Sequence, residues 1–567
     1  MSSQEIITLQ IGHYSNFVGT HWWNLQESSF VYDPKLLEGS PKEIDHDVLF
    51  REGKTIKGDV TYTPRLILFD LKNSLGTLKK DGTLYDVESE ESVNWVGDVT
   101  LHKAQSLKKN KFLQNLDEEL VKKNEDIDSD DIDSDQKEGT ASYKIIDPVF
   151  GKTHYNLDNV VEVWSDYLRT SFHPRSVFIL KDHLHNNTES PFNVFGMGQQ
   201  VCNNGEEWDE IENRLRFFSE ECDYLQGFHI LLDSHSAFGG LASSILSYLS
   251  EEFSSKSRLS FALTPACSSD GTALERSCRI LNSALSLNFC SEHSDLYVPL
   301  SLASSLWKSV GSPRMLPHLQ YQATLDYHSS SILAASLDTA TLPYRKEKSG
   351  VKMSNITSAF NALGRKVSAL YSSLPFPLRS GASIVDTLME LEKTQPWSSM
   401  TPHVNSSSPW LDMCVARGLP TTMINKESHK GDSAKHFTRC TSIDDVIRIY
   451  CSEVFPSSQS ASFVLRDSVK VGLPFPHIFD PHINHCGFIT DTLRPALSGV
   501  ETVPIMTSLQ SNPDVFSYIE SLESCVSKFN IAKHQHFIEA GLEPDDFTEM
   551  LHNLKSLAQC YKHLEDL

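Results

Sequence analysis

The sequence predicts an α/β protein whose strands form a parallel sheet. Four short apolar runs, each bounded by polar or turn-forming residues, have the character of buried strands: residues 6–11, 65–71, 177–180 and 228–232. Segments with helical periodicity lie between them, and in residues 208–222 the side chains of Ile211, Leu215 and Phe218 share one face. Strands that alternate with helices are typical of a parallel sheet.

The first of these strands ends in a glycine turn. The segment EIITLQIGHYSNFVGTHWWN, residues 5–24, passes from a strand at Ile6–Ile11 through Gly12 into the start of a helix. A phosphate-binding loop begins in this way, because the unpaired N–H groups at a helix N-terminus bind anions. The turn itself requires a glycine. Residues 5–24 therefore form a candidate nucleotide-binding segment.

Two charged segments follow the second predicted strand. Residues 103–123 are rich in lysine, with leucines and a phenylalanine interspersed. This pattern fits an exposed helix that leads into a loop or, as the alternative, an amphipathic helix on a membrane surface or a partner. Residues 125–135, EDIDSDDIDSD, contain seven acidic side chains in eleven. Such a tract buries too little apolar surface to fold, so we expect a solvated linker.

The last sixty residues have a helical pattern. In residues 515–529 the apolar side chains recur at helical spacing. A further helix is expected to begin near Glu543 and Pro544, because proline and acidic residues suit a first turn. The C-terminal end is therefore predicted to be helical.

The charge and composition disfavour several classes of protein. The 567 residues include 50 Lys and Arg against 74 Asp and Glu, a net charge of −24. This balance disfavours nucleic-acid binding and broad adhesion to anionic lipid, since both need clustered cations. Eleven cysteines without CxxC spacing are typical of reduced intracellular thiols. No stretch reaches the roughly 20 apolar residues of a membrane helix, so we expect a cytoplasmic protein with peripheral membrane contact.

Common enzyme motifs are absent from the sequence. It has no G-x-S-x-G elbow and no H-E-x-x-H zinc helix, and the glycines near residue 80 lack Walker spacing. The segment PHIFDPHINHC brings five possible zinc ligands close together: His477, Asp480, His482, His485 and Cys486. Because their spacing matches no standard zinc site, a proline-rich loop with incidental histidines is the favoured interpretation and a metal site the alternative.

Six segments, in order along the chain, resemble tubulin. The opening segment resembles the first strand and nucleotide loop of tubulin, with matching residues at Gln10, Gly12, Asn16, Gly19 and Trp23. The other segments are TPRLILFDL (63–71), CDYLQGF (222–228), RILNSALSL (279–287), LPFP (374–377) and AGLEPDDFTEMLHNLKSLAQCY (540–561). The opening HWWN, the acidic insertion and VWSDYL (163–168) make the chain resemble the Misato family, which consists of divergent tubulin-like proteins.

This resemblance implies a tubulin-like fold. It comprises an N-terminal nucleotide-type domain with a parallel sheet, a central helix, a smaller α+β intermediate domain and C-terminal helices. We expect the first domain at residues 1–320, with about 104–142 as an inserted linker. The intermediate domain is expected at 321–504 and the helices at 505–567.

The resemblance also locates the nucleotide site, and its phosphate loop is altered. The tubulin loop G-G-G-T-G-S-G aligns with residues 235–241, where Gly239 keeps its register and Gly240 is new. Phe238 and Leu241 place side chains where phosphate oxygens need room. As a phosphate cradle the loop is damaged.

Other positions of this site differ from tubulin as well. His13 stands where tubulin has a glutamine that faces the phosphate and metal, and Lys72 stands at an acidic position. Asp70 is retained, and so is Asn282, at a position that contacts guanine in tubulin. A second base-contacting asparagine corresponds to Asp326.

The acidic position that supports hydrolysis in tubulin corresponds to Arg365. A cation there cannot orient a water molecule as a carboxylate does. We therefore expect no GTPase activity and no cofactor, with GTP the one cofactor left open. A vestigial nucleotide site that now serves the fold is expected at Gly12, His13, Asp70, Gly239, Gly240 and Asn282.

The Misato resemblance further implies a function. We expect a non-enzymatic protein that regulates mitochondrial distribution, morphology and fusion at the cytosolic face of the outer membrane. It would act through protein partners at the mitochondrial surface or the cytoskeleton, with peripheral membrane attachment and no nucleic acid. Two alternatives stay open: a GTP-binding cytoskeletal protein, and an assembly factor for tubulin or the spindle.

Overall fold

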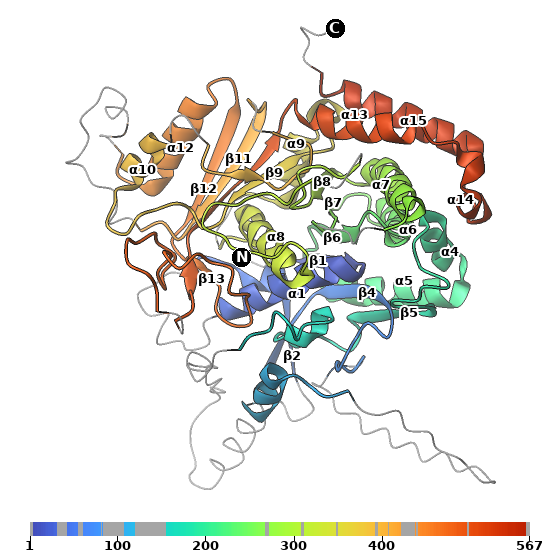
Figure 1. Ribbon diagram of the computed structural model, residues 1–567, viewed down its shortest axis with the longest axis horizontal. Coiled ribbons are helices and arrows are strands. Elements are labelled where there is room, and N and C mark those ends of the chain that lie inside the picture. Colours follow the sequence, from blue (N-terminus) through green and yellow to red (C-terminus); the bar gives the residue numbers. More distant parts are fainter. Residues whose placement is uncertain are drawn as a thin grey trace.

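The structure is a computed structural model, shown in Figure 1. It describes residues 4–30, 42–54, 60–80, 82, 107–119, 155–266, 271–307, 311–347, 350–391, 395–405, 408–420, 437, 440–495 and 498–562. The acidic segment 125–135 lies outside the described residues.

A six-stranded parallel sheet forms the first half of the molecule, which confirms the predicted fold class. Its strands, in spatial order, are β5 (Val177–Leu184), β4 (Leu66–Lys72), β1 (Ile6–Ile11), β6 (Gly227–Asp233), β7 (Ser257–Leu263) and β8 (Leu296–Leu300). The chain leaves β1 toward β4 and β5 on one side, and β6 to β8 lie on the other. The order therefore reverses at β1, and ligands of open parallel sheets bind at such a reversal.

Helices cover both faces of this sheet, so its strands are buried on both sides. Alternate residues of β1 enter different cores: Ile7, Leu9 and Ile11 join one, and Ile6 joins the other. The first core contains α4 (Phe195–Asn203), α5 (Gly205–Glu220), α6 (Phe238–Glu252) and α7 (Ala273–His293). The second contains α1 (His13–Ser28), α8 (Asp326–Ala340) and α9 (Met353–Phe360). Burial on both faces explains why most residues of β1 and β4 are apolar, whereas the buried strand β7 also contains Ser257, Arg258 and Ser260.

A second, mixed sheet has the order β10-β9-β15-β11-β12. Its strands are β9 (Ala369–Ser373), β10 (Ser398–Ser399), β11 (Leu411–Arg417), β12 (Gln459–Leu465) and β15 (Ile505–Ser511), and α10 (Ile384–Glu390) and α12 (Ile443–Val454) pack against it. Strand β15 begins directly after residue 504, where a domain boundary was expected, and it pairs with both β9 and β11. Two small pairs complete the strands described: β2 (Phe50–Lys54) with β3 (Val60–Pro64), and β13 (Val469–Lys470) with β14 (Thr502–Val503).

Helix α8 joins the two sheets through a buried ion cluster. Asp338 of α8 accepts hydrogen bonds from Arg345 (3.0 Å), from Arg417 of β11 (2.7 Å) and from the Trp22 indole of α1 (3.2 Å). All three charged side chains are 5% exposed or less. Because two guanidinium groups face it, the pKa of Asp338 lies below its usual value despite burial. We call this group the junction cluster.

The C-terminal residues are helical, as predicted. They form α13 (Val515–Val526), α14 (Gln535–Glu539) and α15 (Pro544–Gln559), and α13 and α15 lie side by side against α7 (Figure 1). Glu543 precedes α15 as its N-cap, and proline opens the helix. In the described part of the chain, no helix combines the length and the apolar character needed to cross a membrane.

The lysine-rich segment packs differently from our expectation. Residues 111–119 are helical, and their apolar side chains Phe112, Leu113 and Leu116 are buried in the core that contains α1. The Phe112 ring lies 5.9 Å from the ring of Tyr155, edge to face. The apolar face of this helix therefore belongs to the core of the protein and is not presented to a membrane or a partner.

Candidate functional site

Four strand ends meet at the carboxyl edge of the first sheet, and each carries a polar side chain. Gly12 and His13 follow β1, Asp70 lies near the end of β4, His185 follows β5 and Asp233 ends β6. Parallel strands place their carboxyl ends at one edge, which brings these residues together. We call them the edge site.

The N-terminus of α1 is occupied by the chain's own carboxylate. Asp233 accepts hydrogen bonds from the backbone N–H groups of Tyr14 (3.0 Å) and Ser15 (2.8 Å) and from the Ser15 hydroxyl (2.6 Å). These first-turn N–H groups are the ones with which helices bind phosphate. Burial raises the pKa of Asp233 to about 7, although the same hydrogen bonds oppose the rise.

Gly12 is required here for two reasons. Its φ of +126° is a conformation that side-chain-bearing residues rarely adopt. A Cβ at this position would also lie 2.5 Å from Asp233 Oδ2, closer than two unbonded atoms can approach. The glycine predicted for the turn therefore makes room for a carboxylate of the same chain.

Asp70 is fully buried, and its carboxylate is held from several directions. Oδ2 accepts from the Trp164 indole (2.8 Å), from Asn16 Nδ2 (3.0 Å) and from His13 Nδ1 (3.1 Å), and Oδ1 accepts from the Leu71 N–H (2.8 Å). Burial alone would raise its pKa, but His13 and these hydrogen bonds hold the pKa below its usual value. Trp164 belongs to the segment VWSDYL, so this segment fixes the orientation of Asp70.

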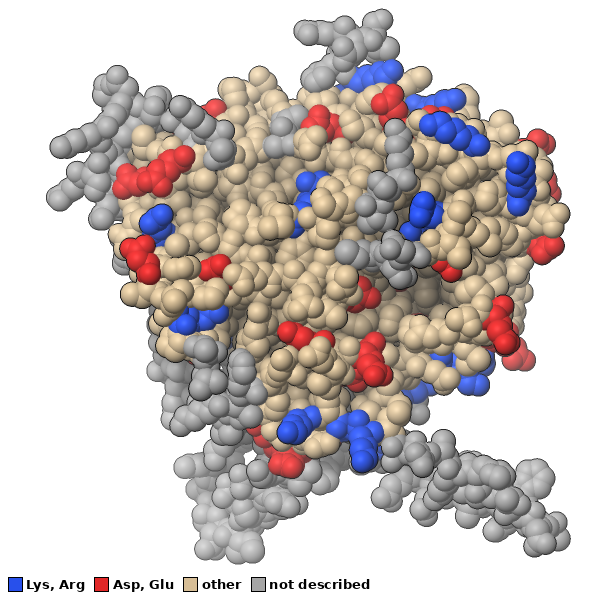
Figure 2. Space-filling view, viewed as in Figure 1, with Lys and Arg blue, Asp and Glu red and all other residues tan. Residues whose placement is uncertain are grey.

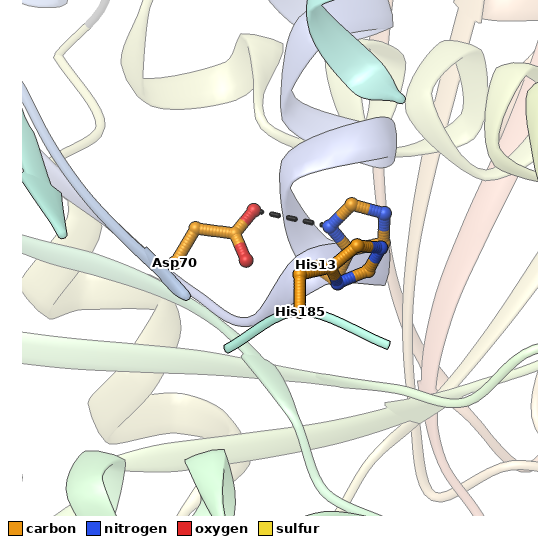
Figure 3. Close-up of side chains that lie close together, drawn as sticks. All are labelled: His13, Asp70 and His185. Carbon is orange, nitrogen blue, oxygen red and sulfur yellow. Dashed lines mark hydrogen bonds and ion pairs between the residues drawn. The ribbon is translucent and has the colours of Figure 1, made fainter. Parts of the chain in front are cut away.

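His13 and His185 lie against each other beside Asp70 (Figure 3). Their ring centroids are 4.1 Å apart, with the planes inclined by 35°. Burial lowers the pKa of His13, but the nearby carboxylates Asp70, Asp233 and Asp326 outweigh this effect, and the pKa is raised. The pKa of His185 is lowered, first by burial and then by His13.

The glycines of the degenerate loop serve helix packing. A Cβ on Gly239 would clash with the Ser286 hydroxyl of α7, and one on Gly240 would clash with the carbonyl oxygen of Phe195 at the start of α4. Both glycines lie in the first turn of α6 and are buried. They let three helices approach closely, as small residues do at such contacts.

Asn282 and Phe238 also form contacts within the chain. Asn282 Nδ2 donates to the carbonyl oxygens of Asn193 (2.7 Å) and His235 (3.1 Å), while Oδ1 accepts from the Phe195 N–H (2.9 Å). Its amide thus ties two loops to α7. Phe238 is 4% exposed and packs edge to face on Phe192, with centroids 5.1 Å apart.

Two other predicted positions lie away from the edge site. Arg365 stacks on the Trp410 ring at 3.4 Å and donates to the Cys560 carbonyl oxygen (3.0 Å), so it joins the second sheet to the C-terminal residues. In the segment 477–486, Asp480 accepts from the His482 N–H (2.8 Å) and from Gln320 Nε2 (2.9 Å), which is the geometry of a hydrogen-bonded turn. Among the described residues, the group whose ligand atoms converge on one point is His13, Asp70 and His185.

The sequence pattern did not identify Asp233 or His185. Each is a single polar residue that directly follows or ends a buried strand. This position at a strand end was the feature of the sequence from which they could have been identified. The predicted residues fall into two groups. Gly12, His13 and Asp70 belong to the edge site, whereas a helix-packing group contains Gly239, Gly240 and Asn282.

Comparisons with known proteins agree with this architecture. The family description "Misato Segment II tubulin-like domain" matches residues 4–118, and "Tubulin domain" matches residues 155–346. The chain is 35% identical to Protein misato homolog 1 of Danio rerio, over 99% of this chain and 97% of that protein. It is likewise 35% identical to Protein misato homolog 1 of Homo sapiens, over 99% and 98%. Protein misato of Drosophila melanogaster is 28% identical over 99% and 98%. With full-length identity at this level and tubulin-like domains in both halves of the first sheet, the chain belongs to the Misato family of tubulin-like proteins.

Proposed function

We propose that this protein is a non-enzymatic member of the tubulin-like fold, in which the edge site stabilises the fold and does not bind a nucleotide. The observation that carries this proposal is Asp233, whose carboxylate accepts the first N–H groups of α1. A nucleotide phosphate and this carboxylate would compete for the same donors, and both are anions. The buried carboxylate is covalently tethered, so it has the advantage at any concentration of free nucleotide.

The remaining positions support the same proposal. The Asn282 amide is occupied by backbone partners at each of its polar atoms, and Phe238 is packed in the apolar core. Arg365, at the position expected to be acidic for hydrolysis, stacks on Trp410. A bound GTP would need the Asn282 and Phe238 contacts to break, and each break has a cost in stability.

The proposed role follows from membership of the Misato family. We propose that the protein regulates mitochondrial distribution, morphology and fusion from the cytosolic face of the outer membrane. Attachment through protein partners fits the net charge of −24 better than direct adhesion to anionic lipid. On the face shown in Figure 2, acidic and basic side chains are interspersed, and neither kind gathers into one patch.

Nucleotide content tests the first part of this proposal. The full-length protein is purified without added nucleotide and denatured, and the released small molecules are separated by chromatography; we expect neither GDP nor GTP. Thermal unfolding is then measured with millimolar GTP and magnesium. Micromolar affinity would add about 4 kcal/mol to stability by mass action, and we expect no such rise. Bound nucleotide or a clear rise would favour the GTP-binding cytoskeletal alternative.

Fractionation tests the second part. We expect the protein to sediment with mitochondria and to be released by alkaline carbonate, which strips proteins that are held by other proteins. Retention in the carbonate pellet would contradict peripheral attachment. Co-fractionation with tubulin and not with mitochondria would favour an assembly factor for tubulin or the spindle.

A further inference from the structure

His13, Asp70 and His185 come from three different elements whose backbones are fixed relative to one another. Asp70 lies in β4, which pairs with β1 on one side and β5 on the other. His13 begins α1 directly after β1, and the His185 N–H donates to the Lys72 carbonyl oxygen (2.9 Å) at the end of β4. Their side chains therefore meet because of the sheet, and no loop rearrangement is needed to bring them together.

The three side chains each offer one ligand atom, and these atoms lie within 4.8 Å of one another. His13 Nδ1 and Asp70 Oδ2 are already 3.1 Å apart. A tetrahedral Zn²⁺ ion, at about 2.0–2.2 Å from nitrogen and oxygen ligands, needs its ligand atoms roughly 3.3 Å apart. The His13–Asp70 pair meets this spacing, and the ligand atom of the half-buried His185 lies within 4.8 Å of both. Figure 3 shows the two rings overlapping on the same side of the carboxylate.

The surroundings of the carboxylate are those of a metal ligand. Metal-ligating carboxylates are usually held by further hydrogen bonds, which fix their direction. Asp70 has such donors in Trp164, Asn16 and the Leu71 N–H. These three bonds persist if a cation replaces the His13 hydrogen bond.

The charge and the exposure of the group also suit a cation. Asp233 and Asp326 add to the negative potential at His13, on which Asp70 acts most strongly. The Asp70 side chain is buried, whereas the His13 side chain is 21% exposed. An ion can therefore enter from the histidine side, where water or another group completes its coordination.

We infer that His13, Asp70 and His185 form a binding site for a divalent transition-metal ion, with Zn²⁺ the best fit to two imidazoles and one carboxylate. Magnesium is disfavoured, since it prefers oxygen ligands and near-octahedral geometry. The inference stands apart from the proposed function, because it requires neither nucleotide nor mitochondria.

Zinc titration of the full-length protein tests the inference. After treatment with a chelator, the protein is titrated with Zn²⁺ by calorimetry, and we expect one tight site per chain. His185→Ala should weaken this site at least tenfold. His183→Ala is the matched control, two residues away at the end of the same strand, and it should bind as the parent does. His482→Ala controls for the other histidine-rich segment and should also bind as the parent does.

The chain contains 23 histidines in all, so a second probe tests whether the metal ion binds at His13 and His185 and not at other histidines. Co²⁺ bound tetrahedrally gives visible absorption bands, and we expect these bands in the parent and in His183→Ala but not in His185→Ala or His13→Ala. Circular dichroism checks that each variant is folded. Absence of a tight Zn²⁺ site in the parent would overturn the inference, and so would parent-like affinity in folded His185→Ala and His13→Ala.

Discussion

Two of the buried aspartates that contact helix α1, Asp338 and Asp233, have different partners. At the junction cluster, Asp338 faces two guanidinium groups and the Trp22 indole, and its pKa lies below the usual range. At the edge site, Asp233 faces the N–H groups of Tyr14 and Ser15, and burial raises its pKa to about 7. The charge of Asp338 is balanced by two full positive charges, whereas Asp233 is stabilised by the dipoles of backbone N–H groups.

This difference indicates which substitutions the junction cluster and the edge site each tolerate. Removing the Asp338 carboxylate leaves two buried cations unpaired, and such a loss is among the most destabilising single changes. Helix N–H groups can donate to another anion, or to a neutral acceptor, in place of a carboxylate. We therefore expect substitutions at the junction cluster to be tolerated less well than substitutions at the edge site.

The largest effect is predicted for the junction cluster. Asp338→Ala should lower the free energy of unfolding by about 3–5 kcal/mol, because Arg345 and Arg417 stay buried without their counter-charge. Chemical denaturation of the purified protein measures this loss. Asp117→Ala is a control, because its ion pair with Lys109 is largely exposed and its removal should change little. A loss no larger than that of the control would contradict the comparison.

The next largest effect is predicted beside the edge site. Phe238→Gly should lower stability by about 3–5 kcal/mol, since it empties the packed position against Phe192. Phe238→Leu keeps most of the apolar contact and should recover most of the loss. Millimolar GTP with magnesium should restore neither variant in a thermal melt. A GTP-dependent rise in melting temperature would show that the loop near Gly239 still binds nucleotide.

A third buried acid extends the comparison to the second sheet. Asp412 of β11 accepts from the Ser508 hydroxyl and from Gln510 Nε2 (3.4 Å), and both donors are neutral groups. Burial raises its pKa from 3.8 to about 6. The folded state thus holds this proton more tightly than the unfolded state does. Its contribution to stability is complete below pH 4 and is lost as the pH rises to 6.

The size of this effect follows from the shift. About two pKa units at 1.36 kcal/mol each give a loss of about 3 kcal/mol at most between pH 4 and pH 7. Asp412→Asn removes the titrating group, so its stability profile should lack this fall. Denaturation of both proteins across this pH range measures the difference. Parallel profiles would show that Asp412 ionises with an ordinary pKa.

Four of the six strands of the first sheet were predicted from the sequence, whereas β7, β8 and the strands of the second sheet were not. Strands buried on both faces are continuous apolar runs, and Ile6–Ile11 was predicted to the residue. In β15 the buried residues include Thr507, Ser508 and Gln510, and the side chains of Ser508 and Gln510 form hydrogen bonds in the sheet interior. The boundary at residue 504 was taken from the resemblance to tubulin, and β15 begins directly after it.

The edge site shows a similar limit. Gly12, His13 and Asp70 were predicted together because a strand end and a retained acid mark them. Asp233 acts on Tyr14 across 219 residues of sequence, and His185 was a single histidine after a strand. Contacts over such distances depend on strand order, which residue patterns do not specify. Asn282 stands at a position that contacts the base in tubulin, and in this structure its amide binds backbone groups.

The smallest effect is predicted for the carboxylates of the acidic segment. Residues 125–135 contain seven acidic side chains and two isoleucines, and they lie outside the described residues. In contrast to Asp338, an acid-rich segment of this composition has little apolar surface to bury and repels itself, so we expect it to add nothing to the folded core. Deleting residues 125–135 should leave the melting temperature nearly unchanged. Replacement by eleven glycines and serines, which keeps the length, should give the same result. A large loss in both variants would mean that these carboxylates have partners in the folded protein. They would then belong, with Asp338, to the acids whose charge is balanced by neighbouring groups.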